Sequence, residues 1–201
     1  MIKRNLLVMG LAVLLSACGF QLRGTGTNEL SIKEIDLGAR NQYGPTVMQL
    51  RRTLESSGVK VHAGAPYKLV LTNEQENQRA ATYDGGSRSA EYELSIVLNY
   101  ALEGQNDTHL LEDKLQVRKY YIHDGNNING SGQEANQVRE EMRRDLVQGM
   151  MARLQQLTPE RLDELQRNAN ERAEAEARAL KEAQRIQDET PQQSPLEVPA
   201  P

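Results

Sequence analysis

The chain has 201 residues, and its 24 basic and 28 acidic side chains give a formal net charge of −4 at pH 7. A net-negative chain is a poor non-specific binder of nucleic acid, because phosphate backbones attract positive charge. A single cysteine excludes an internal disulfide, and a free thiol would be a liability in an exported protein.

Residues 1–17 have the pattern of a secretory signal peptide. Two basic residues near the start are followed by an apolar run over residues 6–15. This run is about half of the roughly 20 residues that a membrane-spanning helix needs, so we expect no permanent span. Small residues then lead to Cys18, and the sequence Leu-Ser-Ala-Cys resembles the lipobox of bacterial lipoproteins.

In lipoproteins with this motif the cysteine thiol receives a diacylglycerol, the chain is cut before it, and the new amino terminus is acylated. Cys18 is therefore the predicted lipid-attachment residue, and no other cofactor is expected. Two or three acyl chains hold a protein almost permanently, at about 0.8 kcal/mol per buried CH₂. Position 19 is Gly rather than Asp, which resembles lipoproteins that are sent to the outer membrane. We therefore expect a lipid anchor on the periplasmic side of that membrane. The alternative is an ordinary signal peptide with a chance cysteine.

Residues 18–29 are polar and rich in Gly and Thr, and we interpret them as a tether before a domain over residues 30–157. The pattern of residues 30–37 predicts a first strand. Pro45 suits the first position of a helix, apolar residues follow on one face, and Gly58 suits its end. A strand followed by an amphipathic helix is therefore predicted.

Residues 59–64 have room for a short extended piece, and three longer strands are predicted at residues 67–80, 89–102 and 109–122. In the middle one, large apolar and aromatic residues alternate with other residues: Tyr92, Leu94, Ile96, Leu98, Tyr100 and Leu102. A period of two places these side chains on one face of a strand. Turn-forming residues separate the strands, so an antiparallel meander is predicted.

Residues 124–132 are rich in Gly and Asn, and we predict a flexible loop there. A second amphipathic helix is expected over residues 133–157, where apolar residues recur every four positions. Residues 158–187 predict a helix with many opposite charges at i, i+4 that buries little and stays solvated. Residues 188–201 contain four prolines and no core pattern, so a disordered tail is predicted.

The predicted domain has the order β-α-β-β-β-α. One sheet face is apolar and needs a cover, which the two amphipathic helices can supply. We therefore predict an α+β fold, a two-layer sandwich of a mainly antiparallel four-stranded sheet and two helices. The polar C-terminal helix and the tail lie outside it. The other sheet face is polar and suits water or a partner.

The sequence carries no recognisable catalytic motif. The histidines at positions 62, 109 and 123 are far apart and lack the spacing of metal ligands. There is no nucleophile elbow, no P-loop and no dinucleotide-binding glycine motif after a strand. We therefore predict neither an enzyme nor a metal site.

Four basic residues are candidates for binding a phosphorylated glycolipid headgroup. They lie on predicted strands or in the turn between the second and third strands: Arg79, Arg88, Arg118 and Lys119. An arginine binds phosphate through a fixed fork of N–H groups, so several at a sheet end could hold such a headgroup. The alternative is that they are solvated charges paired with neighbouring glutamates.

The sequence Cys-Gly-Phe-Gln-Leu-Arg-Gly at residues 18–24 resembles the opening of the lipopolysaccharide-assembly lipoproteins, the LptE (RlpB) family. The Ala-Glu-Tyr start of the main strand at residues 90–92 and the order of elements are similar to that family too. The resemblance covers about residues 1–157. It implies a non-catalytic protein that plugs the β-barrel LptD one-to-one, assists its assembly, and binds lipopolysaccharide during delivery to the outer leaflet.

The family places its lipopolysaccharide contacts on basic residues of the turn between the second and third strands and of the loop before the second helix. In this chain the turn offers Arg88 with Arg79 nearby, whereas residues 124–132 contain no basic residue. Either the contact has shifted to these arginines, Arg118 or Lys119, or the plug role outweighs ligand binding. A generic outer-membrane lipoprotein scaffold for another envelope assembly machine is the alternative function, and a lipoprotein hydrolase is disfavoured for want of a site.

Overall fold

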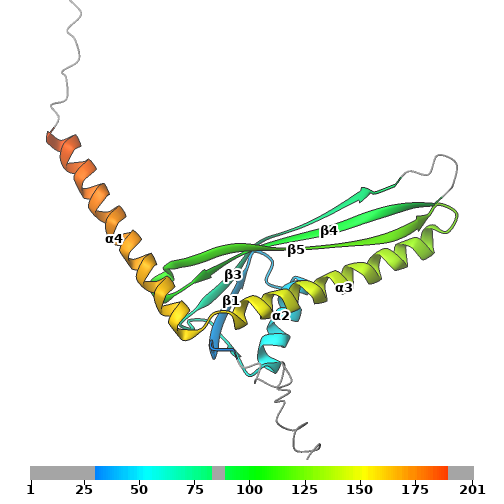
Figure 1. Cartoon of the computed structure of the whole chain (residues 1–201), viewed down its shortest axis with the longest axis horizontal. Coiled ribbons are helices and arrows are strands. Elements are labelled where there is room, and N and C mark those ends of the chain that lie inside the picture. The colour runs from blue at the N-terminus through cyan, green and yellow to red at the C-terminus, as the bar shows by residue number, and fades with distance from the viewer. Residues whose placement is uncertain (1–29, 83–88, 190–201) are drawn as a thin grey trace, which may run out of the picture.

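The computed structural model describes residues 30–82 and 89–189 (Figure 1). In chain order the elements are β1 (Glu34–Ala39), α2 (Pro45–Ser56), β2 (Lys60–Val61), β3 (Lys68–Ala80), β4 (Ser89–Glu103), the 3-10 helix η1 (Gln105–Asp107), β5 (His109–Asp124), α3 (Ile128–Gln155) and α4 (Pro159–Glu189). The predicted signal peptide with Cys18, the tether, Arg88 and residues 190–201 of the predicted tail lie outside the described residues.

The five strands form one mixed sheet in the order β2-β1-β3-β4-β5. Strand β1 is parallel to both β2 and β3, whereas β3, β4 and β5 form the predicted antiparallel meander. The α+β class is confirmed, but the mainly antiparallel four-stranded sheet and the order β-α-β-β-β-α are wrong. Strand β2 adds a fifth member after α2, and α2 is the crossover that allows β1 and β2 to be parallel.

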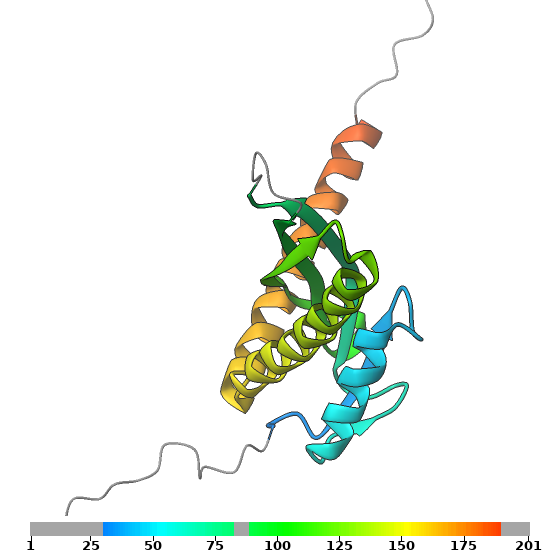
Figure 2. The same ribbon diagram turned by 90° about the vertical axis from the view of Figure 1, so that its right-hand side faces the viewer.

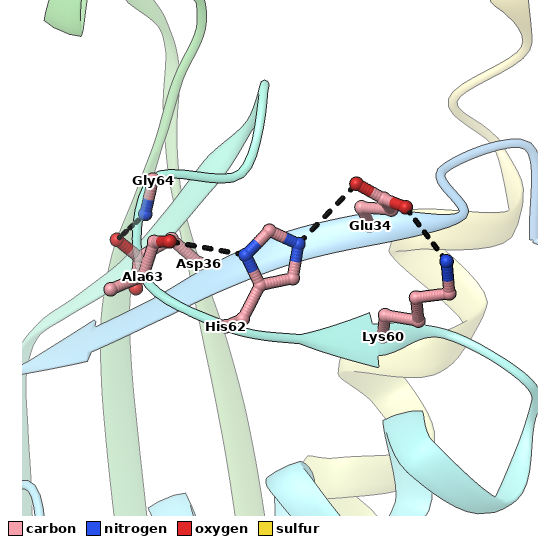
Figure 3. A network of polar contacts seen from close by, with 6 residues as sticks. All are labelled: Glu34, Asp36, Lys60, His62, Ala63 and Gly64. Carbon is pink, nitrogen blue, oxygen red and sulfur yellow. Dashed lines mark hydrogen bonds and ion pairs between the residues drawn. The ribbon is translucent and has the colours of Figure 1, made fainter.

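The segment after β2 carries the chain from one side of β1 to the other, where β3 begins (Figure 3). Gly64 donates its backbone N–H to Oδ2 of Asp36 at 3.3 Å along this crossing. The Glu34 carboxylate lies 3.1 Å from Nζ of Lys60 and 3.3 Å from Nε2 of His62. Lys60 first, and then His62, lower the pKa of the Glu34 carboxyl. These exposed contacts join β2 and the segment after it to β1 and add little stability.

The core lies between the sheet and helices α2 and α3, which cover one face of it (Figure 2). The predicted alternation in β4 is confirmed, because its core-facing residues are at most 4% exposed except for Tyr92, which is half-buried. Helix α3 contributes an apolar stripe at helical spacing: Met142, Leu146, Val147, Met150 and Leu154. The elements are held together by this single cluster of aliphatic side chains.

Helix α3 begins at Ile128, inside the segment that the sequence predicted to be a loop. Asn127 is the N-cap residue, and its Oδ1 accepts the backbone N–H of Gly130 at 3.0 Å. The hydroxyl of Ser131 accepts the backbone N–H of Asp124 at 2.8 Å and ties the first turn to the end of β5. Asn127 and Ser131 are residue types that are disfavoured in a helix interior, and here they stabilise the cap and the first turn of α3.

Helix α4 extends away from the end of the sheet opposite the β3–β4 turn (Figure 1). Its buried residues are confined to its first turns: Leu162, Leu165 and Ala169. Beyond them the helix surface carries ion pairs at i, i+3 or i, i+4, such as Arg178 with Glu174 at 3.0 Å. This helix corresponds to the predicted charged segment, and its exposed half is stabilised by local pairs and propensity rather than by packing.

Tyr100 makes the fold sensitive to alkaline pH. Its hydroxyl donates to Oδ2 of Asp113 at 3.3 Å, and burial followed by the Asp113 charge raises the pKa of Tyr100 to about 12. Because the folded-state pKa exceeds the unfolded value, the stabilisation is complete below about pH 10 and is lost as the pH rises through about 12. Urea unfolding over this range should show a shallower loss of stability for Tyr100→Phe. A Tyr43→Phe control, at a side chain that is 87% exposed, should follow the parent curve; equal slopes for all three chains would contradict the prediction.

Candidate functional site

The sheet face opposite α2 and α3 is solvent-accessible over most of its length, and we call it the open face. Along β5 every second side chain is exposed on it: Lys114, Gln116, Arg118, Tyr120 and Ile122. The alternation follows from the two-residue period of a strand, since the residues between them face the helices. Two of the predicted basic candidates, Arg79 and Arg118, lie on this face toward the β3–β4 turn.

The strand register brings Arg79, Glu93 and Tyr120 side by side on three neighbouring strands. Arg79 donates from Nε to Oε1 of Glu93 at 3.1 Å and from Nη2 to Oε2 at 2.8 Å. The Tyr120 hydroxyl donates to the same Oε2 at 3.0 Å. Such a two-point arginine–carboxylate pair is geometrically specific, and its charge-assisted bonds are stronger than neutral ones.

Glu93 is only 6% exposed although it lies on the open face. The Arg79 guanidinium, by hydrogen bonding, holds the pKa of the Glu93 carboxyl below its usual range. The same carboxylate raises the pKa of Arg79 and of Tyr120. Glu93 therefore stabilises the fold above its unfolded pKa, and this contribution is lost as the pH falls through its lowered folded-state pKa. Arg79 is correspondingly engaged with a protein carboxylate.

Arg118 differs from Arg79 in having no ion-paired acidic side chain among the described residues. With the Gln116 amide oxygen turned toward it, that oxygen accepts from Nε and Nη2 of Arg118 at 3.1 and 3.2 Å. Among the described residues no carboxylate lies within 4 Å of this guanidinium. Its charge reaches Glu93, where it also favours the ionised carboxyl after the larger effect of Arg79. Arg118 is therefore an exposed cation of this face, close to Glu93, that is available to an anionic ligand.

Lys119 lies on the opposite side of the sheet from Arg118, because adjacent residues of a strand face opposite ways. Its Nζ is 3.0 Å from Asp145 and 3.2 Å from Glu141, both on α3. Hydrogen bonds to Asp145 first, and then to Glu141, raise the pKa of Lys119. The structure thus brings Arg79 and Arg118 together and separates Lys119 from them.

Sequence reasoning missed Glu93 and Tyr120 as members of this cluster. The alternation of residues in β4 is enough to predict that Glu93 lies on the polar face of the sheet. The strand register that sets Glu93 opposite Arg79 and Tyr120 cannot be predicted in this way, because it depends on turn geometry across two hairpins.

The described residues show no group of three His, Cys, Asp or Glu side chains able to hold a metal ion. His62 contacts Glu34, and the ring of His123 packs edge-on against that of Tyr92 with centroids 5.4 Å apart. Across residues 30–82 and 89–189, none of the helices combines the length and apolar character needed to cross a membrane.

Comparison with known proteins gives one consistent result. The sequence profile of the family described as "LptE: Lipopolysaccharide-assembly" matches residues 32–154. The LPS-assembly lipoprotein LptE of Pectobacterium atrosepticum is 30% identical over 157 residues, which cover 74% of this chain and 83% of that protein.

Two solved structures share the fold. A minor lipoprotein from Acinetobacter baumannii superimposes with a TM-score of 0.54 at 18% identity, over 63% of this chain and 92% of that one. The rare lipoprotein B from Shewanella oneidensis gives a TM-score of 0.52 at 21% identity, over 61% of this chain and 91% of that one. At these identities the two structures support the architecture alone, and the family rests on the sequence matches. The chain therefore belongs to the LptE lipopolysaccharide-assembly family.

Proposed function

We propose that this chain is a lipid-anchored outer-membrane lipoprotein that plugs the LptD β-barrel, assists its assembly and binds lipopolysaccharide on its way to the outer leaflet. Family membership carries the proposal, since the matching family is described by lipopolysaccharide assembly. The Pectobacterium relative is named an LPS-assembly lipoprotein. The lipobox-like sequence ending at Cys18 supports an anchor of diacylglycerol and N-acyl chains. The proposed work is assembly and binding, without a catalysed reaction.

The surface of the domain supports the plug role. The open face is polar and charged along β5, and the exposed part of β3 is rich in Glu, Gln and Asn. The lumen of an outer-membrane barrel is polar as well. A domain that buries one sheet face under helices and leaves the other largely polar can fill such a lumen with little apolar surface exposed to water.

Arg118 is our first choice for a lipopolysaccharide phosphate contact, because its charge has no protein carboxylate beside it among the residues described. Arg79 lies on the same face two strands away and is engaged with Glu93. Arg88 lies outside the described residues and keeps its place as a candidate from the sequence. Lys119 ranks lowest, since it is paired with two acidic residues of α3.

Purification of the full chain under native detergent conditions tests the proposed function. We expect a stable one-to-one complex with a large β-barrel protein, and native mass spectrometry would report the partner, its stoichiometry and any retained glycolipid. Recovery of the chain only as a monomer would instead favour the generic outer-membrane scaffold.

Reversal of the Arg118 charge should weaken lipopolysaccharide capture. We expect Arg118→Glu to reduce retention of purified lipopolysaccharide in a pull-down by about tenfold, as for loss of one charge-assisted phosphate contact. Lys114→Glu is the matched control, because Lys114 is exposed on the same strand face but farther from the β3–β4 turn. Barrel association should be intact in both variants, and unchanged capture by Arg118→Glu would remove Arg118 from the site.

Arg79→Glu combined with Arg88→Glu should also weaken capture, but this pair is the less selective test. Arg79→Glu leaves the nearly buried Glu93 carboxylate without its guanidinium partner and places a like charge beside it. Reduced capture by that variant therefore counts as a binding effect only if its thermal unfolding matches that of the parent chain.

A further inference from the structure

On the side away from β4, only part of β3 has a neighbouring strand. Strand β1 pairs with Lys68 to Leu71 and ends there. Strand β3 continues to Ala80, paired with β4 on one side, and no other described strand pairs with this half. Every residue from Thr72 to Arg79 is exposed. In Figure 1 this half of β3 borders the sheet on the side away from α3; we call it the free edge of β3.

The backbone of the free edge offers hydrogen-bonding groups in a regular row. Ala81 donates its N–H to the carbonyl of Glu91 on β4 at 2.8 Å. In an antiparallel pair the residues alternate between facing the partner strand and facing away from it. Counting back from Ala81, residues 79, 77 and 75 face β4, whereas Glu74, Glu76 and Gln78 direct their N–H and C=O groups outward.

The side chains of Glu76 and Gln78 point to the helix-covered face of the sheet, so they do not cover the backbone groups of the free edge. Glu76 accepts from Nε of Arg139 on α3 at 2.6 Å. Gln78 donates from Nε2 to the hydroxyl of Tyr121 at 2.9 Å. Both partners lie on the helix-covered side, so the bonds orient the side chains perpendicular to the row of backbone groups. The free edge is thus preorganised as a template for one more strand.

A groove of about 590 Å³ lies beside the free edge, where β1 leaves β3. Its lining includes Val47, Leu71 and Leu98, which are at most 4% exposed, together with Arg40 and the carboxylate of Glu74. Glu74 accepts from the Thr46 hydroxyl at 2.8 Å, and no described cation lies within 4 Å of it. The groove therefore leaves room for a side chain beside the free edge, and a basic side chain there would meet the Glu74 carboxylate.

We infer that the free edge of β3 receives an extended segment of the protein partner, which continues the line of β1 and adds a sixth strand to the sheet. The segment would bind through its backbone, with one side chain in this groove and a basic residue opposite Glu74. This inference rests on the proposed function for the existence of a barrel partner. An open edge without proline, and without a bulge beyond Asn73, is otherwise a site of unwanted strand pairing.

Amide hydrogen exchange on the full chain, alone and in its purified barrel complex, tests this directly. In the isolated chain we expect the amides of Glu76 and Gln78 to exchange fast and those of Gln75 and Asn77 slowly. In the complex the Glu76 and Gln78 amides should become at least about tenfold slower, because their N–H groups gain acceptors.

Three results would overturn the inference. The first is a complex in which the Glu76 and Gln78 amides exchange as fast as in the isolated chain; the proposed function would then stand without this contact. The second is protection of these amides in the isolated chain that grows with protein concentration, which would identify the occupant as a second copy. The third is failure to obtain any barrel complex, which would overturn the proposed function and the partner together.

A pair of substitutions at one position separates the backbone from the side chain. Gln78→Pro removes the outward N–H, a change that an edge strand tolerates when this group faces solvent. Gln78→Ala removes the side chain and keeps the N–H. We expect Gln78→Pro to lower barrel capture by about tenfold relative to Gln78→Ala, with similar thermal unfolding of the two isolated chains. Equal capture by two folded variants would exclude a backbone contact at this position.

Discussion

Replacing Cys18 with serine is expected to abolish palmitate labelling and to release from the membrane fraction all of the protein that no barrel partner holds there. The predicted lipobox leads to this single thiol, and the chain has no second cysteine that could be acylated in its place. One acyl chain gives marginal, reversible membrane binding, whereas two or more give a stable anchor. Loss of every acyl chain should therefore reduce the membrane-bound fraction of the protein outside the barrel complex by far more than tenfold. Metabolic labelling with palmitate, followed by fractionation, measures both the modification and its effect.

The matched control for Cys18→Ser is Ser16→Ala, which keeps a small residue in the predicted lipobox and should preserve labelling. Both variants retain the whole domain from residue 30 onward. A parent chain that takes up no palmitate and is recovered in the osmotic-shock fluid would contradict the anchor. It would also remove the main physical reason for placing this protein at a membrane.

Replacing Leu94 with alanine should be the most damaging of the single changes considered in the folded domain. Leu94 is 0% exposed, and it lies on the central part of the sheet facing α3. Truncation of a fully buried leucine removes its transfer free energy and leaves a cavity, at a cost of about 2–5 kcal/mol. Domains of this kind have a total stability of about 5–15 kcal/mol, so a large share would be lost.

Val97→Ala supplies the control for Leu94→Ala, because Val97 belongs to the same strand but lies on the open face and is half-exposed. Its truncation should cost less than about 1 kcal/mol. Urea unfolding of the two variants and the parent compares the free energies of unfolding. Similar losses for the two variants would show that the sheet is not covered by helices on the Leu94 side.

The elements that were predictable from the sequence are those with one buried and one exposed face. The alternation around Leu94 and Leu98 in β4 is visible because helices cover one side of the strand and solvent the other. Strand β2 has only two residues, too few to show any period. The sequence allowed a short extended piece at residues 59–64 but did not count it as a strand of the sheet, which was therefore predicted to be four-stranded. The early start of α3 was hidden because Asn127 caps the helix from within a Gly- and Asn-rich segment.

For the basic candidates, too, the sequence predicts only part of the arrangement. That Arg118 and Lys119 face opposite sides follows from strand geometry alone. Their partners do not: Lys119 meets α3 residues 22 positions away or more, and Arg79 meets Glu93 across a turn. Ion pairing decides which cations are available to a ligand, and it depends on register and helix placement that no local pattern carries.

Helix α4 projects far beyond the core. Its last buried residue is Ala169 and it ends at Glu189, so about 30 Å of helix projects beyond the core at 1.5 Å per residue. If the helix tilts about its buried first turns, its far end moves through a much larger distance than its base. A spectroscopic label near Glu189 would therefore be a sensitive reporter of such a tilt.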